Sequence, residues 1–142
     1  VEHRSASLPP NMIRINGWNG FFERGLVEVV TLSEQQKSLT DKIFQTLQWK
    51  FKCVVDIPGM ISARIVASII NEAFYTAGEG ISSKEEIDIA MKLGTNYPLG
   101  PFEWAKQIGL ERVYNLLAMM NRHDDRLSVA PALLEELREN TN

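Results

Sequence analysis

The sequence predicts an α+β fold that is mostly helical, with a short parallel sheet followed by a bundle of about five helices. Two observations lead to this prediction. Short segments rich in β-branched residues lie before residue 56, and helix caps and helix stops follow one another closely after residue 58. The segment 56–104 organises the chain, because it holds a long apolar helix, a capped amphipathic helix and a Pro/Gly turn with almost no linker.

Length and composition exclude several classes of protein. The chain has 142 residues and a formal net charge of −3, which is typical of a soluble globular protein with a real core. This charge provides no electrostatic case for nucleic acid or an anionic membrane as partner. The single cysteine, Cys53, excludes an internal disulfide, favours a reducing compartment such as the cytoplasm, and is expected to pack as a small hydrophobe. We expect neither a signal peptide nor a membrane span.

The first part of the chain contains the predicted sheet. Residues 1–11 are polar and are expected to form a loose arm. Strands are predicted over Met12–Asn16 and Leu26–Leu32. A capping-box pattern then opens a helix at Ser33 that runs to about Gln48, and Phe51–Val55 follows as a third strand. A strand–helix–strand order indicates parallel pairing. The apolar stripe predicted for this helix is Leu39, Ile43 and Leu47.

The central helix is predicted from Met60 to about Ala77, after Pro58-Gly59 and before Gly78 and Gly80. Its apolar residues cover an arc of about 220°, wider than the stripe of about 100° on an ordinary surface helix. These residues are Ile61, Ile65, Val66, Ile69, Ile70, Ala73, Phe74 and Ala77. The helix is therefore expected to be covered on two sides, either as a central core helix or with one side in a subunit interface.

Cap and stop signals predict four further helices. The first is capped by Ser82 and Ser83 with acidic residues three positions on and ends at Gly94, and the second begins at Pro101 and stops at Gly109. The third covers 110–120 and the fourth 131–138, with a charged loop over 121–128 between them. The predicted inward residues are Ile87, Ala90, Met91 and Leu93 in the first, and Val113, Leu116, Leu117 and Met120 in the third.

Few residues point directly to catalysis. The sequence contains no G-x-G-x-x-G, no P-loop, no G-x-S-x-G and no Cys/His metal spacing. The two histidines, His3 and His123, lie in polar segments and are expected to face solvent. Glu28 stands inside an apolar strand, and strand alternation alone favours a solvent-facing side chain there.

Four segments nevertheless resemble a known family. PGMISAR (58–64), NEA (71–73), IDIAMKLG (87–94) and YPLGPF (97–102) are similar, in order and spacing, to the C-terminal domain of the 3-hydroxyacyl-CoA dehydrogenases of 3-hydroxybutyryl-CoA dehydrogenase type. The stretch NGWNGFFERGLVEV (16–29) resembles more weakly the end of that family's dinucleotide-binding, Rossmann-type domain. The resemblance implies that residues 1–55 are a remnant or the end of that domain. It also implies that residues 56–142 form a helical substrate-binding and dimerisation domain.

The resemblance implies an activity, but the matching positions differ from the family's pattern. Family members oxidise 3-hydroxyacyl-CoA with NAD in fatty acid metabolism, and a histidine held by a glutamate twelve positions later takes the proton. Glu28 matches the glutamate, whereas Asn16 occupies the histidine position, and an amide cannot act as a general base. Asn19 matches the asparagine after the aromatic residues, Ala63 falls on a substrate-contacting asparagine, and Arg64 matches the arginine of that motif.

Three functions stay open at this point. The first is a diverged domain that binds acyl-CoA or forms a homodimer but does not catalyse a reaction. The second is part of a working enzyme. The third is a purely structural interaction module. The family's Gly-rich phosphate loop has no counterpart in the sequence, so we assign no cofactor-binding residue and no metal ligand. Without a histidine to orient, Glu28→Gln is expected to change little.

Overall fold

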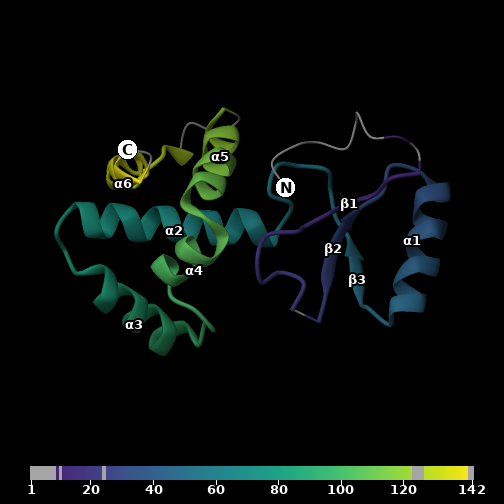
Figure 1. The fold of residues 1–142 in the computed structure, drawn as a ribbon, viewed down its shortest axis with the longest axis horizontal. Helices are drawn as coiled ribbons and strands as arrows, with labels where there is room; N and C mark the ends of the chain where they lie inside the picture. Colours follow the sequence, from purple (N-terminus) through teal and green to yellow (C-terminus); the bar gives the residue numbers. More distant parts are fainter. Residues whose placement is uncertain (1–8, 10, 24, 123–126, 141–142) are drawn as a thin grey trace. The chain divides into compact units, whose positions relative to one another are not determined.

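The fold of the computed structural model follows the predicted order of strands and helices (Figure 1). The structure describes residues 9, 11–23, 25–122 and 127–140, so most of the predicted arm, His3 and His123 lie outside the described residues. The chain divides into two compact units, residues 1–63 and 64–142. The assignment of 1–55 and 56–142 to two functional domains stays a prediction.

The first unit contains a three-stranded sheet in the order β1-β2-β3. Strand β1 (Arg14–Ile15) pairs antiparallel with β2 (Val27–Val30), and β2 pairs parallel with β3 (Phe51–Cys53). Helix α1 (Glu34–Leu47) connects β2 to β3, which confirms the predicted parallel strand–helix–strand unit within a mixed sheet. The apolar core of this sheet is Val27, Val29 and Phe44, with Ile13, Ile15 and Phe51 packed against it.

Helix α1 contacts the rest of its unit along a single row of residues. Its buried residues are Gln36, Thr40 and Phe44, whereas the predicted stripe of Leu39, Ile43 and Leu47 is 37–49% exposed. A glutamine fits the buried row because its amide is satisfied: Oε1 accepts from the Leu32 N–H at 2.5 Å and Nε2 donates to the Met12 carbonyl at 2.9 Å. The adjacent apolar row is therefore only partly covered by the described residues.

The position of Cys53 at the sheet edge differs from the prediction that this side chain is buried. Cys53 is exposed rather than packed as a small hydrophobe, because β3 is the last strand of the sheet and turns this side chain outward. Its sulfur accepts a weak hydrogen bond from the Thr31 hydroxyl at 3.9 Å.

Five helices follow the sheet, as predicted. They are α2 (Ser62–Gly78), α3 (Lys84–Thr95), α4 (Pro101–Ile108), α5 (Leu110–Asn121) and α6 (Pro131–Glu139). The capping box between Ser83 and Glu86 and the inward residues of α5 are confirmed. On α3, however, Ala90 and Leu93 are exposed, and the helix ends one residue after Gly94 with Asn96 in the left-handed conformation.

A buried carboxylate explains why the inner face of α3 differs from the prediction. Asp88 is 8% exposed and accepts hydrogen bonds from the backbone N–H groups of Phe102 at 2.8 Å and Glu103 at 3.2 Å. It therefore satisfies two of the unpaired donors at the start of α4. Gly100 is required beside it, since a Cβ atom at this position would collide with the Asp88 carboxyl group.

One face of helix α2 is buried in the second unit, and part of another face is exposed to solvent. Ile70 and Phe74 are fully buried in the second unit, while Ile65 is 54% exposed. The Asn71 side chain joins α2 to the segment before α6, because Nδ2 donates to the Ser128 carbonyl at 2.8 Å and Oδ1 accepts from the Ala130 N–H at 2.9 Å. None of the helices in the described ranges is both long and apolar enough to cross a membrane.

Candidate functional site

Glu28 is the central residue of the predicted site, and it is buried. Its side chain is 9% exposed, which corrects the solvent-facing position that strand alternation favours. Oε1 accepts hydrogen bonds from the Ser62 hydroxyl at 2.6 Å and the Ser62 N–H at 2.8 Å, and Oε2 accepts from the Ile61 N–H at 3.4 Å. The Glu28 carboxylate therefore accepts hydrogen bonds from backbone N–H groups at the start of α2.

The backbone before α2 presents these donors to Glu28. Gly59 and Met60 both have positive φ, at 78° and 50°, and this turn precedes the first helical residue, Ser62. The first N–H groups of a helix lack partners within the helix and carry its partial positive charge, so a carboxylate is a favourable acceptor there. Glu28 thus has a structural role that is independent of residue 16.

Asn16 lies against the same carboxylate. It is 3% exposed; its Nδ2 donates to Glu28 Oε2 at 3.3 Å, and its Oδ1 accepts from the Trp18 N–H at 3.4 Å. The structure therefore brings together the two residues matched to the family's histidine and glutamate. A neutral amide can donate or accept a hydrogen bond here, but it cannot take a proton near neutral pH.

The other three predicted site residues lie in different surroundings. Asn19 is exposed in a turn in which the Phe21 N–H donates to the Trp18 carbonyl at 2.9 Å. Ala63 is fully buried at 0% exposure in the first turn of α2, and Arg64, the next residue, is half-buried. Asn19 and Ala63 take part in none of the hydrogen bonds that hold Glu28.

Two residues of this site were not predicted from the sequence. Ser62 provides two of the hydrogen bonds to Glu28; a serine immediately after a Pro-Gly turn and before an apolar helix is the signal that could have identified it. Trp18 is 1% exposed, and its Nε1 donor has no hydrogen-bond partner within the part of the chain that the structure describes. No pattern in the sequence distinguishes a paired from an unpaired indole.

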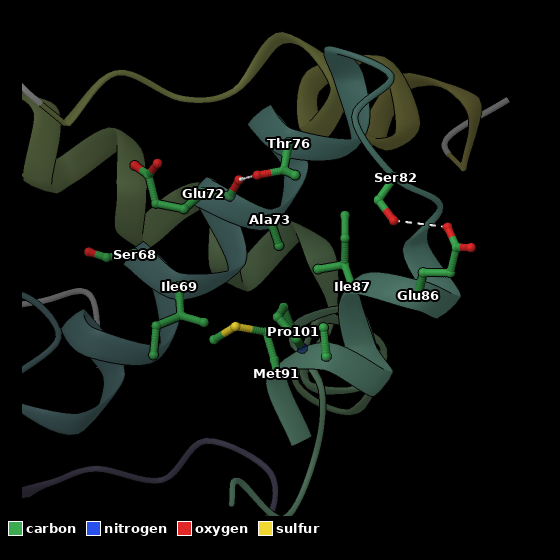
Figure 2. Close-up of a pocket in the computed structure, with 11 residues that line it drawn as sticks. Ser68, Ile69, Glu72, Ala73, Thr76, Ser82, Glu86, Ile87, Met91 and Pro101 are labelled. Carbon is green, nitrogen blue, oxygen red and sulfur yellow. Dashed lines mark hydrogen bonds between the residues drawn. The ribbon is translucent and has the colours of Figure 1, made fainter. Parts of the chain in front are cut away.

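A separate pocket lies within the second unit, between α2, α3 and the start of α4 (Figure 2). Its volume is about 440 Å³. The lining residues are Ser68, Ile69, Glu72, Ala73, Thr76, Ser82, Glu86, Ile87, Ala90, Met91 and Pro101. None of these belongs to the predicted site, so the structure provides a second candidate for binding.

The turn from β2 into α1 does not have the composition of a pyrophosphate-binding turn. The turn from β2 into α1 is Thr31-Leu32-Ser33, without glycine, and the Ser33 hydroxyl already accepts from the Gln36 N–H at 3.2 Å. Close approach of a pyrophosphate to a helix N-terminus requires a Gly-rich turn. Within the described ranges, no three His, Cys, Asp or Glu side chains gather as metal ligands.

Comparison with known proteins confirms the resemblance. The sequence model of the family described as 3-hydroxyacyl-CoA dehydrogenase, C-terminal domain, matches residues 59–142. A 3-hydroxybutyryl-CoA dehydrogenase of Clostridioides difficile is 33% identical over 141 residues, which are 96% of this chain and 50% of that protein. A 3-hydroxyadipyl-CoA dehydrogenase of Escherichia coli K12 is 40% identical over 101 residues, which are 69% of this chain and 21% of that protein.

The fold is also similar to a solved structure. The crystal structure of (S)-3-hydroxybutyryl-CoA dehydrogenase from Ralstonia eutropha matches with a TM-score of 0.81 and 31% identity, over 90% of this chain and 47% of that one. The chain thus spans half or less of the length of these relatives. Since the family match at residues 59–142 covers more than half of the 142 residues, the chain belongs to the 3-hydroxyacyl-CoA dehydrogenase C-terminal domain family.

Proposed function

We propose that this chain binds acyl-CoA and, by itself, does not oxidise it. The observation that carries this proposal is the Asn16–Glu28 pair, in which an amide donates to a carboxylate that also holds Ser62 and Ile61. Loss of a general base lowers the rate by about 10²–10⁴. The turn between β2 and α1 lacks the glycines of a pyrophosphate-binding turn, which supports the proposal that the chain by itself does not carry out NAD-dependent oxidation.

The proposed roles of the site residues follow from their chemistry. Glu28 acts as an acceptor for the start of α2, and Asn16 is available to donate to a thioester or keto oxygen. Asn19 and Arg64 are proposed ligand contacts by their match to the family. Ala63 has no hydrogen-bonding side chain where the family's asparagine would orient the substrate, so we expect burial of the acyl chain, rather than specific hydrogen bonds, to dominate binding.

The test is a calorimetric titration with acetyl-, butyryl- and hexanoyl-CoA, with free CoA as the control ligand. We expect dissociation constants on the order of 0.1–1 mM, which tighten by up to about 0.8 kcal/mol for each added methylene. Equal affinity across the series, or no binding at millimolar ligand, would contradict acyl-CoA binding. Turnover of 3-hydroxybutyryl-CoA with NAD at on the order of 1–10³ per second would contradict the absence of catalysis.

A homodimer along α2 is a second proposal, supported by the exposed apolar residues of that helix. Ile65 is 54% exposed and Ile69, one turn later, is half-buried. A buried interface would cover this row, and Ile65→Lys should then halve the mass measured by light scattering. Leu110→Lys, a half-buried position on α5, is the matched control. A wild-type mass near 16 kDa at high micromolar concentration would contradict the dimer.

A role as one part of a working enzyme is the third proposal, supported by the open side of α1. The row Leu39, Ile43 and Leu47 lies beside the buried row of the helix, where a larger α/β layer would cover it. Reading the complete coding sequence tests this proposal, because a preceding dinucleotide-binding segment is expected. The lone cysteine further supports a reducing compartment, and we propose the cytoplasm.

A further inference from the structure

The indole N–H of Trp18 is a buried hydrogen-bond donor without an acceptor. The side chain is 1% exposed, and among the described residues its Nε1 is the single buried side-chain nitrogen or oxygen that has no hydrogen-bond partner. A buried tryptophan usually directs this N–H to an acceptor, and the large majority of buried polar side-chain atoms in proteins are paired. The indole of Trp18 therefore has a free donor that an incoming oxygen atom can use.

Trp18 lies in the same turn as Asn16, at the proposed acyl-CoA site. The backbone N–H of Trp18 donates to Asn16 Oδ1 at 3.4 Å, and Asn16 Nδ2 donates to Glu28 Oε2 at 3.3 Å. A side-chain amide nitrogen carries two hydrogens, so Asn16 keeps one further N–H besides the one that faces Glu28. Two side-chain donors, two residues apart in the chain, thus have no acceptor among the described residues.

The turn and its ring packing fix the orientation of the indole. The Phe21 N–H donates to the Trp18 carbonyl at 2.9 Å, and the rings of Trp18 and Phe21 pack edge to face at a centroid distance of 5.7 Å. The ring therefore cannot turn toward a different acceptor without losing this contact. Gly17 and Asn19, on either side of Trp18, are exposed, so we expect a ligand oxygen to reach Nε1 through a shift of the turn that Gly17 permits.

These donors select an uncharged oxygen acceptor. An indole N–H and an amide N–H can only donate, and a thioester carbonyl oxygen is an acceptor of matching chemistry, whereas a thioether offers only a weakly accepting sulfur. We propose that Trp18 is a binding residue of the acyl-CoA site, with its Nε1–H donating to the thioester oxygen beside the free N–H of Asn16. This inference rests on the proposed function and adds to it the residue that distinguishes a thioester from a ligand without the oxygen.

The test is a calorimetric titration of the full chain with butyryl-CoA and S-butyl-CoA, a thioether with the same chain length but no carbonyl oxygen. We expect the wild type to bind butyryl-CoA about fivefold more tightly than S-butyl-CoA. Trp18→Phe should reduce this preference to about twofold or less, with an unchanged circular dichroism spectrum. Trp49→Phe removes an indole that is 46% exposed in the same unit, and as the matched control it should leave the preference unchanged.

The indole resonance of Trp18 in the ¹⁵N-labelled wild type gives a readout that does not depend on the folding of a variant. Butyryl-CoA should move the Nε1–H proton downfield, and S-butyl-CoA should not. Equal affinities for the two compounds, a preference that Trp18→Phe retains, or an unmoved indole proton overturns the role of Trp18 while acyl-CoA binding stands. A direct contact of this proton with a bound water in the butyryl-CoA complex also overturns it. Absence of binding of both compounds at millimolar concentration contradicts the proposed function itself, and this inference with it.

Discussion

Replacement of Glu28 by glutamine tests whether the buried carboxylate supports the fold. In the wild type, Oε1 accepts from the N–H and hydroxyl of Ser62, and Oε2 accepts from the Ile61 N–H and from Asn16 Nδ2. Glutamine provides one acceptor oxygen. Its NH₂ group would face the second pair of donors, so that pair would lose its acceptor.

The expected cost follows from these contacts. A buried polar group left without a partner costs about 1–3 kcal/mol, and the interaction of a negative charge with a helix N-terminus adds about 0.3–1 kcal/mol. With the Ser62 bonds retained, we expect Glu28→Gln to lower the free energy of unfolding by about 1–4 kcal/mol. This differs from the sequence-based expectation of little change, which considers only the missing histidine.

Urea unfolding at pH 7, followed by circular dichroism and tryptophan fluorescence, measures this loss. Glu85→Gln is the matched control because Glu85 is an exposed glutamate in the first turn of α3, and its effect should stay within about 0.5 kcal/mol. If Glu28→Gln also stays within about 0.5 kcal/mol at an unchanged m-value, the carboxylate does not support the start of α2 and our reasoning is refuted.

Three further predictions concern single contacts. Gly100→Ala should lower the free energy of unfolding in urea by about 2–4 kcal/mol, because the added Cβ atom would meet the Asp88 carboxyl group. Gly94→Ala, in open space on α3, is the control and should be neutral or stabilising. Equal effects of the two substitutions would contradict this prediction. Trp18→Phe should change the free energy of unfolding by less than about 1 kcal/mol, since it removes a buried donor that has no partner among the described residues. A loss above about 2 kcal/mol would indicate that the indole N–H is bonded. The lowered pKa of Glu86 stabilises the folded chain above the ordinary carboxyl pKa of 4.5, and this contribution is lost as the pH falls through the lower folded-state pKa. Glu86→Gln should therefore show a smaller loss of helicity than wild type between pH 7 and 3, and parallel pH curves would contradict the assignment.

Local signals in the sequence were sufficient for most elements of the fold. Caps, stops and the strand–helix–strand order predicted β2, α1 and the five later helices, because capping and turn chemistry act within a few residues. The inner face of α3 was predicted only in part: Ile87 is buried as expected and Ala90 and Leu93 are not. Asp88 is buried as well, because the first N–H groups of α4 need an acceptor. The exposed row of α1 also depends on which segments pack beside it, and periodicity cannot report that.

The candidate site was predicted only in part, for the same physical reason. Spacing and resemblance identified Asn16 and Glu28, and in the structure Asn16 Nδ2 lies 3.3 Å from Glu28 Oε2. Neither pattern could show that the other partner of Glu28 is the start of α2, because Ser62 is 34 residues away in the sequence. A glutamate within an apolar strand therefore requires a search for distant unpaired donors before it is placed in solvent.

The contacts of Glu28 and Asn16 bear on our proposal that these residues match the glutamate and the histidine of the family's catalytic pair. Glu28 holds a helix start through bonds of 2.6 and 2.8 Å, so its removal carries a structural cost whatever residue stands at position 16. The Asn16 side chain makes two longer bonds, of 3.3 and 3.4 Å, so we expect its replacement to disturb less of the fold. We therefore expect a carboxylate at position 28 to stabilise the fold even where no proton is transferred, so that its presence alone would not indicate dehydrogenase activity. We propose that the identity of residue 16 is the feature that reports on the chemistry.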